Sequence, residues 1–295
     1  MRLLTRRRFL KTSAAVAGAG TLALASDGLY EANHPRVVTM DMPLPRLPQA
    51  WDGLRVVQLS DFHYDPTFSV VPIRKAAEVV NGLRPDLILL TGDFITVPLP
   101  DVSSRSRASR AAAGAGPCAE ILAPLRAPYG VWAGMGNHDA FSDEALVIET
   151  LQHYGIKTLR NACTALERGN SRLWLAGIDD LLEGEPDIDK TLAGIPPSEP
   201  VILMAHEPDF AIQLAGSYAV DFQLSGHSHG GQVRLPFVGA VVLPSMARRY
   251  PMGFYDLGAL KLYTNVGIGT VRLAVRLNCP PEITVFTLRS GKKMA

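Results

Sequence analysis

The sequence predicts an α/β protein built as a four-layer α-β-β-α sandwich of two mixed sheets. Short, continuously apolar runs at 54–59 and 86–91 are typical of buried strands, and a helical pattern separates them. After residue 157 the pattern changes to a series of short strands that only brief helical segments interrupt. Two sheets with helices outside fit this alternation better than one doubly wound sheet.

Composition places the chain among ordinary globular proteins. Its 295 residues are 47% hydrophobic and 19% charged, with a formal net charge of +1. This balance provides no electrostatic footprint for nucleic acid, and no run of like charge is long enough to form an interaction tail. Cys118, Cys163 and Cys279 allow at most one disulfide and lack metal-ligand spacing, so we interpret them as small, semi-buried residues.

The N-terminus resembles a twin-arginine (Tat) export signal. Arg6 and Arg7 form the pair, 9–11 is the flank, and 23–25 offers a small-residue cleavage site before Ser26. A membrane anchor is the alternative, but 12–25 is shorter than the roughly 20 apolar residues that span a bilayer. The resemblance implies that residues 1–25 are a signal peptide read by the Tat machinery. It also implies export to the periplasm or the outer face of the cell envelope.

Residues 26–49 are rich in proline and lack apolar periodicity. They are typical of a linker, or of an arm that lies along the edge of a sheet. Beyond them we find no internal repeat and no further linker. Residues 50–290 are therefore predicted to form one catalytic domain.

The first predicted strand, 54–60, runs into Asp61 and His63. Side chains two residues apart on a strand point to the same side, so this carboxylate and imidazole form half of a chelate. A helix at 72–83 has proline in its first turn and apolar residues along one face. The strand at 86–91 ends in Asp93. A strand, helix and strand of this kind favour parallel pairing, and ligands bind where such strands end.

The segment 98–116 is polar and low in complexity, which favours a mobile surface loop. A short helix at 118–126 and a strand at 129–136 follow. A second helix is predicted at 143–154, with Ser142 as its N-cap. The later elements are strands at 158–166, 172–178, 201–205, 222–225, 232–235, 262–266 and 283–288, with short helices at 186–193 and 208–215.

Eight polar residues follow apolar runs directly, and five of the chain's seven histidines are among them. They are Asp61, His63, Asp93, Asn137, His138, His206, His227 and His229. A half-buried imidazole or carboxylate without a partner is costly. A shared metal site explains the whole set better than eight separate strand ends. Carboxylate, amide and imidazole ligands without thiolate suit Mn, Fe or Zn.

In order and spacing these residues resemble the calcineurin-like metallophosphoesterases. The family pattern D-x-H, G-D, G-N-H-D/E, H and G-H-x-H is complete here. Its matches are Asp61-Phe62-His63, Gly92-Asp93, Gly136-Asn137-His138-Asp139, His206 and Gly226-His227-Ser228-His229. The match runs through nearly the whole chain after residue 54.

The resemblance implies two adjacent divalent metal ions. Asp61, His63 and His229 would bind the first ion, Asn137, His206 and His227 would bind the second, and Asp93 would bridge both. Two such ions about 3.5–4 Å apart share a water, lower its pKa and stabilise in-line displacement at phosphorus. The implied activity is hydrolysis of a phosphomonoester or phosphodiester by a hydroxide that bridges the metals. His138 would protonate the leaving oxygen, with Asp139 orienting its ring, or would make a structural hydrogen bond.

Departures from the family narrow the class. The protein serine/threonine phosphatases extend the Gly-Asp motif with acidic and arginine residues, whereas this chain continues with the apolar 94–97, which disfavours that activity. The tail at 267–283 is similar to a small bacterial branch, Tat-exported or membrane-attached, of envelope phosphoesterases. Two alternatives stay open. One is a pyrophosphatase acting on a nucleotide-sugar or lipid-linked diphosphate of the UDP-diacylglucosamine type, and the other is a cell-wall- or membrane-binding protein with incidental activity.

Several residues near the predicted site have two interpretations each. The apolar stretches 97–99 and 237–246 could seat an acyl chain or could pack internally. Gly267 and Gly269 fit an ordinary turn as well as a substrate contact. Arg272 and Arg276 could neutralise substrate phosphates.

Overall fold

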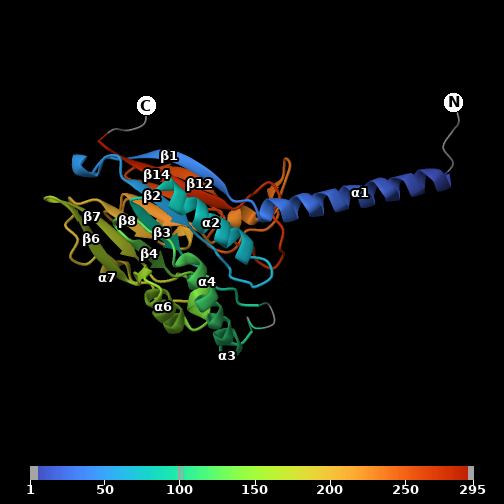
Figure 1. Cartoon of the computed structure of the whole chain (residues 1–295). Helices are drawn as coiled ribbons and strands as arrows, with labels where there is room; N and C mark the ends of the chain where they lie inside the picture. The colour runs from blue at the N-terminus through green and yellow to red at the C-terminus, as the bar shows by residue number, and fades with distance from the viewer. Residues whose placement is uncertain (1–5, 99–100, 102, 292–295) are drawn as a thin grey trace.

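Two six-stranded sheets pack face to face in the computed structural model, which describes residues 6–98, 101 and 103–291 (Figure 1). Apolar side chains between the sheets form one buried layer, which includes Leu89 of the first sheet and Leu224 of the second. Two further clusters lie on the outer faces, where helices cover each sheet. The structure therefore confirms the four-layer α-β-β-α prediction.

The first sheet has the strand order β1-β14-β2-β3-β4-β5. The strands β2, β3, β4 and β5 are parallel to one another, and β14 joins them by antiparallel pairing with β2. Because β1 and β14 run parallel to each other, both oppose the rest, and the sheet is mixed. The bounds are β1 Arg36–Leu44, β14 Glu282–Ser290, β2 Arg55–Leu59, β3 Leu87–Thr91, β4 Val131–Gly134 and β5 Lys157–Thr158.

The second sheet has the order β12-β13-β9-β8-β7-β6. Its inner strands β13, β9, β8 and β7 are parallel, and an antiparallel strand closes each edge. A short separate hairpin, β10 paired with β11, lies outside both sheets. The bounds are β12 Gly253–Leu257, β13 Leu260–Thr264, β9 Phe222–Ser225, β8 Val201–Met204, β7 Ser171–Gly177, β6 Ala162–Arg168, β10 Arg234–Leu235 and β11 Gly239–Ala240.

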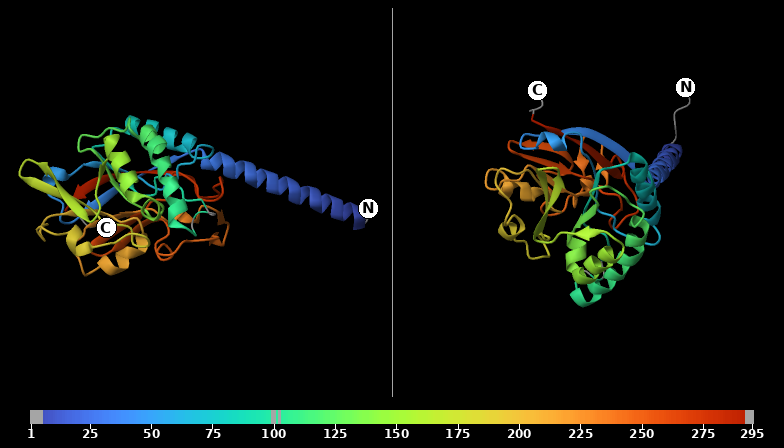
Figure 2. Two further views of the ribbon diagram at one scale, coloured as in Figure 1. Left: turned by 90° about the horizontal axis from the view of Figure 1, so that it is seen from below. Right: turned by 60° about the vertical axis from the view of Figure 1, so that its left-hand side comes forward.

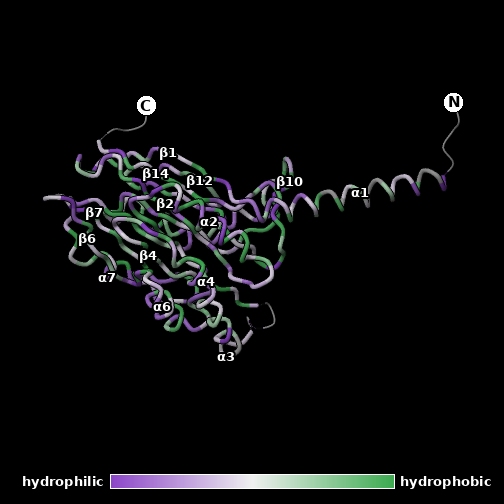
Figure 3. The backbone as a smooth tube through the Cα atoms, in the orientation of Figure 1, coloured by the Kyte–Doolittle hydropathy of each residue, from purple (hydrophilic) through white to green (hydrophobic). Residues whose placement is uncertain are grey.

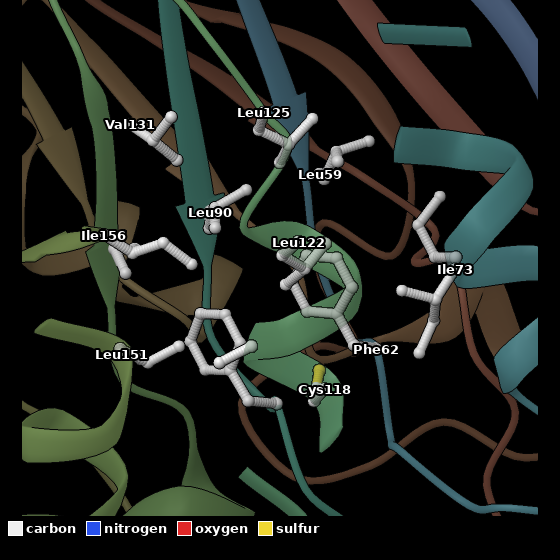
Figure 4. Close-up of a cluster of buried hydrophobic side chains, with 14 of the residues drawn as sticks. Leu59, Phe62, Ile73, Leu90, Cys118, Leu122, Leu125, Val131, Leu151 and Ile156 are labelled. Atoms are coloured by element: carbon white, nitrogen blue, oxygen red, sulfur yellow. The ribbon is translucent and has the colours of Figure 1, made fainter. Parts of the chain in front are cut away.

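Helices α2, α4 and α6 cover the outer face of the first sheet. Figure 4 shows Ile73 of α2, Leu122 of α4 and Leu151 of α6 around strand residues such as Leu90. Short helices cover the second sheet. The bounds are α2 Val70–Leu83, α3 Arg105–Ala108, η2 Ser109–Gly114, α4 Ala115–Leu122, α5 Asn137–Phe141, α6 Glu144–His153, α7 Ile188–Thr191, η3 Pro208–Phe210 and α8 Ala211–Leu214, with 3-10 turns η1 Gln49–Trp51 and η4 His229–Gly231.

The first helix, α1 (Arg6–Ala32), projects away from the body of the protein (Figures 1 and 2). Its contacts with the body are made by its last turns. The carbonyl of Gly28 accepts a hydrogen bond from the Arg276 N–H, and the Glu31 carboxylate accepts from the backbone N–H groups of Asn278 and Cys279. Among the described residues, no helix is both long enough and apolar enough to cross a membrane.

Four sequence-based expectations need correction. Of the two alternatives for residues 26–49, the irregular linker is wrong for 36–44 and the arm along a sheet edge is correct, because β1 pairs with β14 along nine residues at the edge of the first sheet, which begins before residue 50. The segment expected to be a loop up to residue 116 is helical from Arg105 onward, because Ala108, Ala112 and Ala115 pack into the core. Asp143, not Ser142, caps α6 by accepting from the Leu146 N–H. The strand β12 and the helix α5 were not predicted.

Candidate metal centre

The eight predicted residues meet at one end of the sandwich. Each follows a parallel strand: Asp61 and His63 follow β2, Asp93 follows β3, and Asn137 and His138 begin α5 after β4. From the second sheet, His206 follows β8, and His227 and His229 follow β9. Because the carboxyl ends of parallel strands share an edge, the two sheets bring these side chains together from opposite sides.

Three overlapping groups of side chains could each hold a metal ion, with ligand atoms within 4.8 Å of one another. The first is Asp61, His63 and His229, which is the predicted set for the first ion. The others are Asp93 with His206 and His227, and His63 with Asp93 and His138. Asp93 thus belongs to two of the three groups.

Neighbouring ligand atoms have the separations expected around a shared cation. The Asp93 Oδ2 atom lies 3.3 Å from His63 Nε2 and 3.2 Å from His206 Nε2. The Asp61 Oδ1 atom lies 3.3 Å from His229 Nε2. Two atoms that bind one ion at about 2.1 Å in adjacent octahedral positions lie about 3.0 Å apart. The distances therefore fit a metal centre.

Two fully buried carboxylates give the centre its negative charge. Burial alone would raise the pKa of both groups. His229 beside Asp61 and His206 beside Asp93 outweigh that effect and hold both pKa values well below the usual range. Burial opposes protonation of His206 too, but Asp93 and Asp61 raise its pKa well above the ordinary value. The carboxylates therefore stay ionised and require nearby positive charge.

Hydrogen bonds orient two of the histidines toward the centre. The Nδ1 atom of His206 lies 2.6 Å from the Thr91 carbonyl and donates to it, which leaves Nε2, beside Asp93, as the nitrogen whose proton a metal ion would replace. The Nε2 atom of His227 donates to the Ser245 carbonyl at 2.8 Å, which leaves Nδ1 as a lone pair. Backbone carbonyls commonly orient metal-ligating imidazoles in this way. Sequence analysis missed both carbonyls, because backbone groups leave no signal in residue type.

The lone pair of His227 faces another acceptor. Its Nδ1 atom lies 2.9 Å from the Asn137 Oδ1 atom, while burial lowers the pKa of His227 to about 4, so the ring is neutral. Both nitrogens of His63, and Nε2 of His206 and of His229, are buried without a hydrogen-bond partner. A metal ion binds one nitrogen of each ring, so cations held by His63, His206 and His229 would satisfy three of these four nitrogens, and the residues fit the two ions that the family resemblance implies.

Five of the seven predicted ligands adopt a left-handed backbone. Asp61, His63, Asp93, His227 and His229 have φ between 43° and 65°. This conformation is costly for residues other than glycine, and it concentrates at functional sites where the surrounding structure enforces it. At these strand ends the left-handed conformation turns the ligand side chains toward the metal centre.

His138 lies beside the centre, and its ring is held differently from our expectation. The backbone N–H of Val97 donates to His138 Nδ1 at 2.9 Å, so the proton of the neutral ring is on Nε2. Burial lowers the pKa of His138 to about 4. Asp139 does not orient this ring. Its carboxylate accepts from the backbone N–H groups of Phe94, Ile95 and Gly136 instead.

The two arginines near the site differ from each other. Arg276 is buried and donates to the carbonyls of Gly269 and Cys279, and its guanidinium also lies 3.5 Å from His229 Nδ1, so it braces the loop beside this ligand. Arg272 is exposed and lines the cavity over the centre. Gly267 and Gly269 pack against Asp61 and Phe62, where a Cβ atom would overlap the neighbouring chain. Their close packing against the metal-binding strand end favours the interpretation of an ordinary turn.

The centre opens into a cavity of about 580 Å³. Its floor is polar, and one wall is apolar and includes Val241, Val242 and Val271. A smaller cavity of about 140 Å³ adjoins it at Asn137 and His138, and Val97 also lines it. Part of the predicted apolar stretch 237–246 thus lines the site, whereas Leu99 lies outside the described residues.

Comparison with known proteins identifies related chains. A family model described as calcineurin-like phosphoesterase matches residues 54–231. The uncharacterized metallophosphoesterase YkuE of Bacillus subtilis (strain 168) is 34% identical over 98% of this chain and 99% of its own. The phosphodiesterase YaeI of Escherichia coli (strain K12) is 31% identical over 97% of this chain and 100% of its own. The UDP-2,3-diacylglucosamine pyrophosphatase LpxG of Chlamydia muridarum (strain MoPn / Nigg) is 26% identical over 87% of this chain and 90% of its own.

Proposed function

The chain belongs to the calcineurin-like phosphoesterase family, and from that premise we propose that it is a two-metal phosphodiesterase of the cell envelope. As a member of this family it is a metal-dependent hydrolase of phosphoesters. The observation that carries the proposal is the complete, converging ligand set. Asp61, His63 and His229 would hold one ion, Asn137, His206 and His227 the other, and Asp93 both.

The two ions would supply positive charge for the phosphoryl oxygens and a water of lowered pKa. The residues of the chain position the reacting groups, donate a hydrogen bond and exclude water. Asp93 Oδ1 accepts from the backbone N–H of His138 at 2.9 Å and so couples the position of that ring to the metal centre. The Nε2–H of His138 then donates a hydrogen bond to the phosphate or its leaving oxygen. The apolar cavity wall excludes water from one side of the substrate.

A diester fits the cavity better than a monoester. A diester has two substituents on phosphorus, and about 580 Å³ above the centre leaves room for both. The relative YaeI, named a phosphodiesterase, aligns along its whole length. Among the described residues that line the cavity, the one Lys or Arg side chain is the exposed Arg272, and the buried Arg276 donates to backbone carbonyls, so no buried side-chain cation faces the second charge of a monoester.

The test is hydrolysis of bis-p-nitrophenyl phosphate and p-nitrophenyl phosphate after reloading with Mn, Fe, Zn or Mg, with metal content measured alongside. We expect about two bound ions and faster release of nitrophenol from the diester. Absence of bound metal would refute the metal centre. A preference for the monoester would refute the choice of a diester.

A diphosphate is the second candidate substrate. The apolar wall of Val241, Val242 and Val271 would fit a lipid-linked group, and LpxG is named a pyrophosphatase. Two bound ions with no turnover of either nitrophenyl ester, but with cleavage of a UDP-linked diacyl sugar, would favour this reading. Retention on envelope fractions without turnover of any phosphoester would favour a wall- or membrane-binding protein.

We also propose export through the Tat pathway, with residues 1–25 as the signal peptide. The described side chains from Arg6 to Ala25 are exposed, and contacts with the body begin at Gly28, so cleavage before Ser26 would leave those contacts intact. Replacement of Arg6 and Arg7 by lysine should retain the protein in the cytoplasm, as measured by fractionation. Mass spectrometry of the exported protein should find Ser26 at its N-terminus. Export that is unaffected by the double replacement would refute the Tat assignment.

A further inference from the structure

We infer that the hairpin β10–β11 and the adjacent loop form a surface that docks onto an anionic lipid bilayer. This surface, called here the apolar tip, consists of exposed large apolar side chains: Leu235, Phe237, Val238, Val241, Val242 and Leu273. The inference goes beyond the proposed reaction and does not depend on it, because docking can be measured without substrate.

Hydrogen bonds join the two parts of the apolar tip. The side-chain amide of Gln232 donates to the carbonyls of Val271 and Leu273, and its oxygen accepts from the Val271 N–H. The Arg234 N–H donates to the Leu277 carbonyl, and Val233 forms a bridge with Leu277. The hairpin is thus held against the loop that carries Leu273. Contiguous apolar residues of this kind typically mark an interaction surface.

Phe237 is the most exposed member of the tip. It lies in the turn of the hairpin with φ of 65°, a strained conformation for an aromatic residue, and its side chain is fully exposed. The Val238 N–H closes the turn by donating to the Leu235 carbonyl at 3.3 Å. Neither packing nor turn preference explains phenylalanine at this position. Insertion into the interface of a bilayer would bury the side chain.

The charge of the segment that carries the tip is strongly one-sided, and Glu31, a carboxylate from another element, accepts hydrogen bonds from the backbone N–H groups of Asn278 and Cys279. Between residues 222 and 281, Asp256 is the single acidic residue, against six basic ones. Lys261 pairs with Asp256, and Arg276 is buried. This leaves Arg234 and Arg272 beside the tip and Arg248 and Arg249 in the chain that follows it. Apolar side chains with flanking arginines complement the anionic headgroups of a lipid surface.

A second copy of this chain is a poorer partner. In a two-fold contact the same surface of both copies is used, so the arginines of both tips would lie in one interface without a carboxylate of the segment 222–281 other than Asp256. Like charges across an interface are destabilising. An anionic bilayer has an apolar interior beneath negatively charged headgroups. The interior matches the apolar side chains of the tip, and the headgroups match its flanking arginines.

The tip also lies at the metal centre and at the base of α1. Val241, Val242 and Leu273 line the cavity over the centre, so docking would place the cavity mouth at the lipid surface. Figure 3 shows α1 leaving the body at the end where β10 lies.

The experiment must report on the tip itself, because α1 could bind lipid by a separate route. We place tryptophan at the tip with Phe237→Trp, and on α6 with Leu146→Trp as the control, since Leu146 is also an exposed apolar residue. Each full-length variant is mixed with vesicles of phosphatidylglycerol and phosphatidylcholine, and the emission of the unsubstituted chain is subtracted. We expect a blue shift and quenching by brominated acyl chains for Phe237→Trp alone. Equal responses of the two variants, or none, would overturn the inference.

Two further measurements test the charge and the occupant. The affinity for vesicles, obtained by titrating the Phe237→Trp response with lipid, should be about fivefold lower on pure phosphatidylcholine for each arginine that contacts headgroups. The double variant Phe237→Ser/Val238→Ser should reduce the quenching of a tryptophan introduced by Leu273→Trp. Equal responses on both vesicle types would overturn the role of charge. A blue shift of Phe237→Trp that grows with protein concentration without vesicles would instead identify a second copy as the occupant.

Discussion

Asp93 contacts both halves of the centre with one carboxylate. Its Oδ2 atom lies between His63 and His206, and its Oδ1 atom accepts from the His138 N–H. Asp93→Asn keeps the shape and removes the charge. Loss of a residue that merely orients a ligand costs 10–100-fold in metal affinity or activity, so we expect at least about a 100-fold loss of kcat/KM and less bound metal. Metal analysis and turnover of the diester measure both.

The matched control is Asp86→Asn. Asp86 is a half-buried carboxylate that accepts from the Arg55 N–H at 2.8 Å, away from the centre. We expect its metal content and turnover to stay near those of the unsubstituted chain. Unchanged metal content and turnover in Asp93→Asn would contradict a bridging role for Asp93.

The ring of His138 should act as a neutral donor across the working pH range. Its pKa of about 4 lies below neutrality because of burial, and the Val97 N–H occupies the side of Nδ1. Because protonation occurs only below about pH 4, raising the pH from 6 to 9 does not change the charge of this ring. We expect His138→Ala to lower kcat by about 10²–10³-fold, the effect of removing one hydrogen-bond donor, by a constant factor between pH 6 and 9 and with unchanged bound metal.

The pH dependence of diester turnover, compared between the unsubstituted enzyme and His138→Ala, tests whether the ring acts in its neutral form. A fall in kcat with rising pH that appears in the unsubstituted enzyme and disappears in His138→Ala would mean that a protonated ring is required. The original hypothesis, in which His138 acts as a protonated acid, would then be correct.

At the scale of single elements, the turn at Gly267–Gly269 holds the end of β2. The Gly269 N–H donates to the Asp61 carbonyl, and a Cβ atom at Gly269 would lie 2.0 Å from the Phe62 carbonyl oxygen. Gly269→Ala should therefore displace the backbone between Asp61 and His63. We expect a loss of about 1–3 kcal/mol in the free energy of unfolding, together with less bound metal.

Gly116→Ala is the control for this substitution. Gly116 is in α4 with nothing near its Cβ position, so alanine should stabilise the protein by about 0.5–1 kcal/mol. Thermal unfolding compares the two variants. A higher KM in Gly269→Ala with unchanged melting temperature and metal content would show a substrate contact instead of a supporting turn.

At the scale of the whole molecule, β1 closes one edge of the first sheet. A chain that begins at Ser26 keeps β1 and the contacts of Gly28 and Glu31, so its melting temperature should equal that of the full chain within about 1 °C. A chain that begins at Pro45 lacks β1 and exposes the backbone of β14 as a long apolar edge. Such edges pair with other chains, so we expect aggregation.

Thermal unfolding and light scattering distinguish these outcomes. A monomeric, cooperatively folded chain from Pro45 onward would show that the domain begins near residue 50, as the sequence had indicated. A large drop in melting temperature on removal of residues 1–25 would assign a structural role to the free part of α1.

The sequence alone determined the layers and the composition of the site. Apolar runs of strand length with helical segments between them predict two sheets covered by helices, because burial on both faces of a strand demands continuous apolar residues. The eight site residues were identifiable because each follows such a run, and because their types and order resemble one family. Residues far apart in the sequence, such as Asp61 and His229, could be assigned to one site because the assignment used residue type and order and not distance along the chain.

Only the tertiary structure decided which partners complete the site. The carbonyls of Thr91 and Ser245 and the N–H of Val97 set the ring orientations of His206, His227 and His138, yet every residue type carries the carbonyl and every type except proline carries the N–H. The pairing of the proline-containing β1 with β14 also depends on a strand nearly 250 residues away. Residue type determines the chemistry of a side chain. Backbone hydrogen-bond partners and the pairing of edge strands depend on long-range packing, which local sequence does not encode.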